Sequence, residues 1–134
     1  MARVTVVNDT PDFLELVGDI LEGDRYDTTL IDGDRDDAVE LIRESDPDLL
    51  MIDLRLGSEG LSGWQIAQEI RRDEAFAGLP VLVCSADLQA MEELEADLAP
   101  DRHVATLRKP FEIDELMRLI DRLVDESARV RSPG

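Results

Sequence analysis

The sequence predicts an α/β fold in which five parallel strands form one sheet and five helices cover it. Short β-branched and aliphatic runs alternate with longer stretches of helical period, which is the pattern of βαβ units. Two of the runs, residues 49–52 and 81–84, are apolar without alternation, so we expect helices on both faces of the sheet. The chain has 134 residues, 43% of them hydrophobic, which suits one domain with its own core.

The predicted strands are residues 3–7, 26–31, 48–52, 80–84 and 103–107. A helix follows each of them. The first helix begins at Thr10 as N-cap with Pro11 in the first position, and Gly23 ends it. For the second helix we expect Asp34 as N-cap and Pro47 beyond the end.

The remaining three helices have their own boundary signals. Ser62 and Gln65 have capping-box spacing for the third. The fourth is expected over residues 87–98, before Pro100, and the fifth from Glu112, with acidic residues in its first turn. We therefore expect one domain over residues 1–126 and a frayed tail over residues 127–134.

Charge and cysteine content exclude several classes of function. Acidic residues number 32 against 14 basic, so the formal net charge is −18, and such a surface repels nucleic-acid phosphates and anionic lipid headgroups. We expect neither a nucleic-acid nor a membrane partner. Cys84 is the only cysteine, which rules out an intrachain disulfide. With no apolar run of signal-peptide or membrane-span length, the expected location is the cytoplasm.

Polar side chains follow four of the five predicted strands. Asn8 and Asp9 follow the first, Asp53 the third, Ser85 the fourth and Lys109 comes just after the fifth. In an open α/β sheet the ligand site lies at the carboxyl ends of the strands, so we expect these side chains to converge. Two carboxylates with backbone oxygens and water suit Mg²⁺, while the ammonium and hydroxyl groups suit the oxygens of a phosphoryl group.

Four short motifs carry a family resemblance. They are residues 6–11 (VVNDTP), 47–54 (PDLLMIDL), 80–86 (PVLVCSA) and 109–111 (KPF). In this order and spacing they resemble the receiver domains of two-component response regulators, in particular stand-alone chemotaxis receivers, over about residues 3–125. The resemblance implies a flavodoxin-like sheet with strand order 2-1-3-4-5.

The resemblance also implies a role for each site residue. Asp53 would be the phosphoacceptor, taking its phosphoryl group from a histidine kinase or phosphotransfer protein. Asp9, Asp53 and the backbone carbonyl of Arg55 would hold Mg²⁺. Lys109 would pair with one phosphoryl oxygen, and Ser85 would hydrogen-bond another and pull its loop inward as the switch.

The sequence departs from the family pattern at several positions. Asn8 replaces the usual first acid, so it would support the metal only through a bound water. Thr106 stands where the family often has a switching aromatic residue in the relay. The loop between Asp53 and Gly63 is two residues longer than usual, and residues 98–100 replace the Gly-Ala pair before the last strand.

The resemblance also suggests contacts around the pocket, from the positions that these residues hold in the family. Arg55 and Asp87 have opposite charges and are expected to pair across the pocket mouth. With Thr106 in the relay position, the signal is expected to pass through movement of residues 85–88 and the start of the fourth helix. The alternative is a resting-state hydrogen bond from the Thr106 hydroxyl to Ser85.

The predicted function is a single-domain, phosphorylation-controlled switch that signals by contact with an unidentified downstream protein. It is not an enzyme beyond its own phosphotransfer and dephosphorylation. The alternative is a pseudo-receiver, an interaction module that signals without phosphate. Asn8 favours the alternative, whereas Asp53, Ser85 and Lys109 oppose it.

Overall fold

A computed structural model describes residues 2–23, 26–56, 61–98 and 103–131, and it has the predicted α/β architecture. Five strands form one sheet in the order β2-β1-β3-β6-β7, with every neighbouring pair parallel. In chain order these are the first to fifth long strands, so the predicted order 2-1-3-4-5 is confirmed. The five strands are β1 (Arg3–Asn8), β2 (Asp27–Asp32), β3 (Leu49–Asp53), β6 (Val81–Ser85) and β7 (Val104–Arg108).

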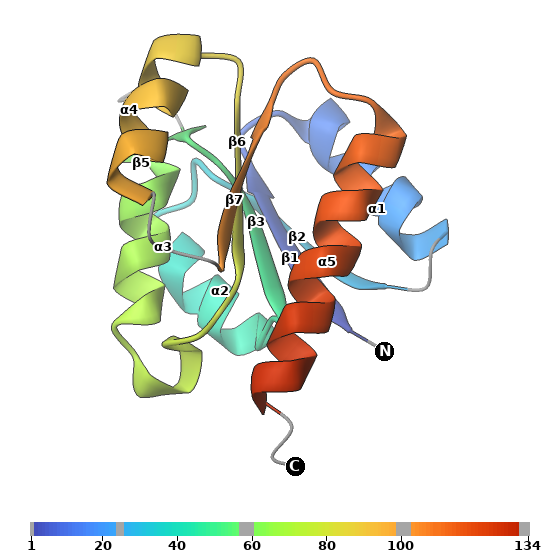
Figure 1. The fold of residues 1–134 in the computed structure, drawn as a ribbon, viewed down its shortest axis with the longest axis vertical. Helices are drawn as coiled ribbons and strands as arrows, with labels where there is room; N and C mark the ends of the chain where they lie inside the picture. Colours follow the sequence, from blue (N-terminus) through green and yellow to red (C-terminus); the bar gives the residue numbers. More distant parts are fainter. Residues whose placement is uncertain (1, 24–25, 57–60, 99–102, 132–134) are drawn as a thin grey trace.

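Helices cover both faces of the sheet, as Figure 1 shows. Side chains from α1 and α5 close one core with the sheet, and side chains from α2, α3 and α4 close the other. β3 and β6 are buried at every position, because these central strands have helices on both sides. The helices are α1 (Pro11–Gly23), α2 (Ala38–Ser45), α3 (Gly63–Arg71), α4 (Leu88–Leu98) and α5 (Ile113–Arg131), with a 3₁₀ turn at Glu74–Phe76.

Each of the five long strands ends one residue later than the sequence predicts. The polar residue at the carboxyl end still pairs through its backbone, as Asp53 does with Cys84 and Ser85 with Arg108. The sheet ladder therefore includes the strand ends that carry the predicted site.

The predicted N-cap of the second helix is wrong. α2 begins at Ala38, not after Asp34, and the preceding Asp37 makes no side-chain cap bond. The Oδ1 atom of Asp32 accepts the backbone N–H of Asp34 at 2.9 Å, and Arg35 pairs with Asp37 at 2.8 Å. These local bonds stabilise a turn where helix was expected.

The last helix is longer than expected. α5 continues to Arg131, past residue 127, where the tail was predicted to begin. The segment contains no glycine or proline before Pro133, so nothing in it stops the helix earlier. No helix in the described part of the chain is long and apolar enough to cross a membrane.

A small antiparallel hairpin lies beyond β3 and was not predicted. β4 (Arg55–Leu56) pairs with β5 (Leu61–Ser62) at the base of the longer loop. Leu56 is fully buried, and its side chain occupies the space above Gly33. The loop tip (residues 57–60), the side chain of Ser62 expected to cap α3, and Ala99 and Pro100 lie outside the described residues.

Candidate functional site at the carboxyl edge of the sheet

Polar residues converge at the carboxyl edge of the sheet. β1 ends at Asn8, β3 at Asp53 and β6 at Ser85, and Lys109 directly follows β7. Because all these strands are parallel, their ends meet at one edge, as predicted. The structure brings Asn8 and Lys109 into direct contact with Asp53.

Three donors surround the carboxylate of Asp53. Its Oδ2 atom accepts hydrogen bonds from Lys109 Nζ at 2.5 Å and from Asn8 Nδ2 at 3.0 Å, while Oδ1 accepts the backbone N–H of Arg55 at 3.1 Å. The residue is 9% exposed. A buried carboxylate needs such partners, and here they also fix its orientation at an accessible edge.

Lys109 is held from two sides. Its backbone N–H donates to the carbonyl of Ser85 at 3.0 Å. Its ammonium lies 4.2 Å from the ring centroid of Phe13 on α1, and that ring meets Phe111 edge-on at 6.1 Å. A cation over an aromatic face is attracted by the ring quadrupole, so Phe13 helps to aim Lys109 at Asp53. The sequence analysis missed this role, because Phe13 also fits the apolar stripe of α1.

Asn8 turns its amide nitrogen toward Asp53. Its Oδ1 accepts the backbone N–H of Thr10 at 2.8 Å, which assigns the amide orientation and leaves Nδ2 as the donor to Asp53. Asn8 is 1% exposed. It therefore contacts the carboxylate directly, whereas the sequence suggested support of a metal through water.

Ser85 and Asp87 organise the start of α4. The Ser85 hydroxyl accepts the backbone N–H of Asp87 at 3.0 Å, and Asp87 Oδ1 accepts the N–H of Ala90 at 3.0 Å as the N-cap of the helix. Asp87 Oδ2 lies 2.5 Å from Arg55 Nη2, so the predicted ion pair is present. The Ala90 N–H and then Arg55 hold the pKa of the Asp87 carboxyl below its ordinary value.

The predicted bond between Thr106 and Ser85 is wrong. Thr106 Oγ1 donates to Glu95 Oε1 on α4 at 3.0 Å, and Arg108 reaches the same carboxylate at 3.3 Å. Thr106 is opposite Val83 in the β6–β7 register, whereas Ser85 is opposite Arg108. Thr106 thus lies two residues before the position opposite Ser85, and its hydroxyl contacts α4.

Gly63 is a second residue whose role the sequence analysis missed. A Cβ atom there would lie 1.9 Å from the backbone carbonyl oxygen of Asp53, and the Gly63 N–H donates to the Leu54 carbonyl at 2.7 Å. Only glycine permits this approach of α3 to the end of β3. The sequence marked Gly63 only as a loop boundary, because no local pattern reveals a contact with Asp53.

The oxygen groups at this edge suit a divalent cation. Asp9 directly follows Asn8 at the end of β1 and is partly exposed, so the sequence offers a second carboxylate at this edge of the sheet. The Oδ1 atom of Asp53 that binds Arg55 N–H has a second lone pair. Among the described residues no three or more histidine, cysteine or acidic side chains are clustered so that they could hold a metal ion by themselves. Mg²⁺ needs only one or two carboxylates, with waters as its other ligands. The chemistry of these donors fits Mg²⁺.

The sequence matches the family model of the response regulator receiver domain over residues 4–121. The chain belongs to this family. Its receiver domain is 31% identical over 132 residues to the DNA-binding dual master transcriptional regulator RpaA of Synechocystis, covering 97% of this chain and 52% of that protein. It is also 31% identical over 134 residues to the DNA-binding response regulator MtrA of Mycolicibacterium smegmatis, covering 98% and 56%.

Solved receiver structures show the same fold. The crystal structure of NtrX from Brucella abortus superposes with a TM-score of 0.80 at 27% identity, covering 97% of this chain and 28% of that one. The chain spans about half the length of RpaA and of MtrA, the two curated relatives. Receiver domains are regulatory switches that work with histidine kinases or phosphotransfer proteins, which places this chain in two-component signalling.

Proposed function

We propose that this receiver domain accepts a phosphoryl group on Asp53 from a phosphohistidine of a histidine kinase or phosphotransfer protein. A carboxylate oxygen of Asp53 attacks the phosphorus as the phosphorus–nitrogen bond of the donor breaks, and the histidine nitrogen keeps the bonding electrons. The product is an acyl phosphate on Asp53. The observation that carries the proposal is the contact of Lys109 Nζ with Asp53 Oδ2 at 2.5 Å, on a carboxylate that Asn8 and Arg55 also orient.

The residues around Asp53 have distinct parts in this transfer. Lys109 would bind an oxygen of the phosphoryl group, because its ammonium already contacts the carboxylate that receives this group. Asp9, Asp53 and the Arg55 carbonyl would hold Mg²⁺, which when bound offsets the negative charge of the phosphoryl group. Cys84 lies next to Ser85 but takes no part, since it is buried and burial raises the pKa of its thiol to about 12.

Ser85 supports a route from the phosphoryl group to α4. In the structure its hydroxyl accepts the N–H of Asp87, which caps α4. A phosphoryl oxygen that draws the Ser85 hydroxyl toward Asp53 would remove this bond and release the cap. The switch therefore moves the loop from Ser85 to Leu88 and the start of α4.

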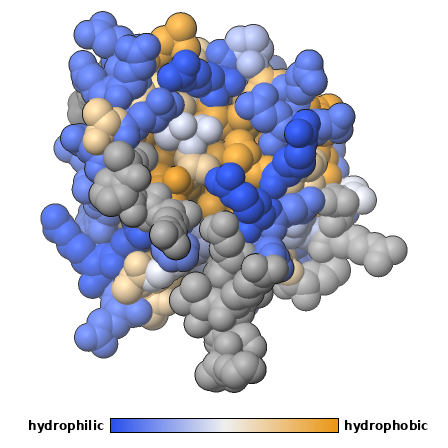
Figure 2. Space-filling model, viewed as in Figure 1, coloured by the Kyte–Doolittle hydropathy of each residue, from blue (hydrophilic) through white to orange (hydrophobic). Residues whose placement is uncertain are grey.

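The output surface on this proposal is the face of α4, β7 and α5. Figure 2 shows hydrophobic side chains in the middle of this face, around β7, with hydrophilic side chains around them. An apolar centre with a polar rim is typical of a protein contact. The two curated relatives are named DNA-binding proteins, but the charge of −18 on this chain argues against a nucleic-acid contact by the receiver domain itself.

A second candidate is a pseudo-receiver that signals without phosphate. The direct bond from Asn8 to Asp53 favours it, because Asn8 occupies the position of an acid and satisfies the phosphoacceptor in the resting state. The two candidates differ in one measurable property, the chemical reactivity of Asp53.

Intact mass spectrometry after exposure to acetyl phosphate, with and without Mg²⁺, tests the proposal. We expect the mass of one phosphoryl group to be added in the presence of Mg²⁺, to be lost with hydroxylamine, and to be absent in Asp53→Asn. Asp36→Asn, which changes an exposed aspartate of the β2–α2 turn, is the matched control and should label normally. No labelling of the folded wild-type protein would support the pseudo-receiver instead.

A further inference from the structure

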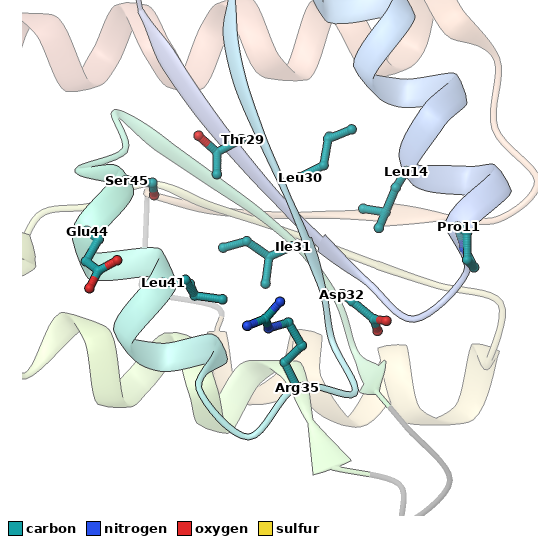
Figure 3. A pocket seen from close by; sticks show the side chains of 10 residues that line it. All are labelled: Pro11, Leu14, Thr29, Leu30, Ile31, Asp32, Arg35, Leu41, Glu44 and Ser45. Atoms are coloured by element: carbon teal, nitrogen blue, oxygen red, sulfur yellow. The ribbon is translucent and has the colours of Figure 1, made fainter.

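A groove runs along the outer edge of the sheet, where β1 separates it from β3 and Asp53. It has a volume of about 610 Å³ and is lined by residues of α1, β2, the β2–α2 turn and α2. Figure 3 shows Leu14 of α1 on one side of β2, and Leu41 and Glu44 of α2 on the other. The groove therefore follows the edge of β2, with α1 forming one wall and α2 the other.

β2 is the terminal strand of the sheet, and part of its backbone faces outward. The Asp27 N–H donates to the carbonyl of Ala2 and the Gly33 N–H to that of Asn8, each at 3.0 Å. Since backbone groups alternate in direction along a parallel strand, Thr28 and Leu30 turn their N–H and C=O groups away from β1. In the described part of the chain no strand pairs with this outer edge. Such an edge is a template for one more strand.

The groove has apolar positions on both sides of that edge. Leu30 is 43% exposed, and its side chain lies over Gly18 of α1, where a Cβ would come within 3.0 Å of it. Leu14 on the α1 side and Leu41 on the α2 side are partly buried. An added strand directs alternate side chains to the two faces of the sheet, so it would meet Leu14 and Leu30 on one side and Leu41 on the other.

Charge decides the kind of partner. Asp32 and Glu44 line the groove and are exposed, and the adjacent turn adds the exposed Asp34 and Asp36. Among the lining residues only Arg35 is basic, and it is paired with Asp37. The surroundings are therefore negative, which favours basic side chains in the partner. A second copy of this chain is disfavoured, because both copies would carry a charge of −18.

We propose that the edge of β2 and this groove bind an extended basic segment of another protein, which adds to the sheet as a strand next to β2. Its backbone pairs with Thr28 and Leu30, its apolar side chains on the α1 side cover Leu14 and Leu30, and its lysine or arginine side chains on the α2 side lie near Glu44. This surface is distinct from the α4–β7–α5 face and needs no phosphate on Asp53.

Titration of the whole chain with a synthetic peptide tests this proposal. The probe is a capped peptide of about eight residues, the length of an ordinary strand, that alternates lysine with valine or leucine. We expect chemical-shift changes in ¹⁵N-labelled protein centred on Thr28–Asp32, with slower amide exchange at Thr28 and Leu30. A peptide with proline at alternate positions, which lacks the N–H donors, should bind at least about tenfold more weakly.

Matched variants identify the surface. Leu30→Lys places a positive charge in the groove and should weaken binding about tenfold, and Glu44→Lys should weaken it in a salt-dependent way. Leu16→Lys introduces the same charge at a leucine of α1 that is 56% exposed and lies outside the groove, so it should leave binding unchanged. All three positions are exposed, so the variants should remain folded, which circular dichroism checks.

Three results would overturn the proposal. One is equal binding of the proline-containing peptide, which would show that no strand is added. Another is a shift pattern centred on α4 or α5. The third is concentration-dependent self-association that Leu30→Lys abolishes, because the groove would then be covered by a second copy.

Discussion

Arg55 and Asp87 join β4 to the first turn of α4 through an ion pair with Nη2 and Oδ2 2.5 Å apart. The pair lies across the mouth of the Asp53 pocket, since Arg55 N–H bonds to Asp53 and Asp87 N–H bonds to Ser85. Water that hydrolyses an acyl phosphate on Asp53 would have to pass this mouth. If Asp53 is phosphorylated as proposed, we expect the ion pair to affect the lifetime of the phosphorylated state.

The first prediction is that loss of this pair shortens that lifetime. Arg55→Ala combined with Asp87→Asn removes the charges, while the asparagine oxygen still caps α4. Because solvent screens an exposed pair, its effect on the rate is small, and we expect dephosphorylation to become up to about fivefold faster. Decay of the mass of phosphorylated protein measures the rate. Arg35→Ala with Asp37→Asn is the control pair, and equal decay in all three proteins would contradict the prediction.

The second prediction concerns Asn8 and the metal. Asn8→Asp adds a carboxylate beside Asp53, so Mg²⁺ should bind on the order of 1 kcal/mol more tightly, about a fivefold change in dissociation constant. Without the metal the same variant should be less stable than wild type, because a buried carboxylate replaces a donor to Asp53. Isothermal titration and thermal unfolding measure the two effects. Asn8→Ala, which adds no charge, should not tighten binding. An unchanged titration of Asn8→Asp would show that residue 8 does not face the metal.

The third prediction concerns the contact between Glu95 and Thr106. Glu95 holds α4 to β7 through Thr106 and Arg108, in the place where the family often has a switching aromatic residue. Glu95→Ala should weaken this attachment by about 1 kcal/mol, and amide exchange in α4 should become about fivefold faster. Glu92→Ala, at an exposed position of the same helix, is the control. If α4 exchanges equally in both variants, Glu95 does not restrain it.

The fourth prediction is that Gly63 tolerates no side chain. Gly63→Ala would bring a Cβ within 1.9 Å of the Asp53 carbonyl, so α3 or the end of β3 must move. We expect the free energy of unfolding to fall by about 2–4 kcal/mol. Chemical denaturation measures this loss. Gly78→Ala, where nothing lies within 4 Å of the new atom, should change stability by less than about 1 kcal/mol.

The fifth prediction follows from the buried thiol of Cys84. Burial raises its pKa to about 12, above the ordinary value of 9.0, so native protein should resist iodoacetamide at pH 8 while unfolded protein reacts. The unfolded thiol ionises first as pH rises. Its contribution to stability is therefore complete below about pH 9 and is lost progressively between about pH 9 and 12. Cys84→Ala should lose this part of the alkaline pH dependence, and rapid alkylation of the native protein would contradict the assignment.

The sequence alone determined the order of the strands and helices and the position of the candidate site. Apolar runs such as residues 81–84 identify buried strands, and strand ends in a parallel sheet meet at one edge, so this pattern is sufficient to group Asp53, Ser85 and Lys109. The grouping of these three residues uses only information that lies within a few residues along the chain. The Arg55–Asp87 pair followed instead from the positions that these residues hold in the resembling family.

Contacts between distant elements were decided only by the tertiary structure. Whether Thr106 reaches Ser85 or Glu95 depends on the β6–β7 register and on the position of α4, which no local pattern specifies. The contact of Phe13 with Lys109 has the same origin, since α1 is adjacent to the end of β7 only after the sheet has formed. The start of α2 was predicted wrongly because Asp32 accepts hydrogen bonds from the backbone N–H groups of Asp34 and Arg35, and these compete with the helix. Side-chain partners depend on packing distances between elements, and these arise only when the whole sheet and its helices assemble.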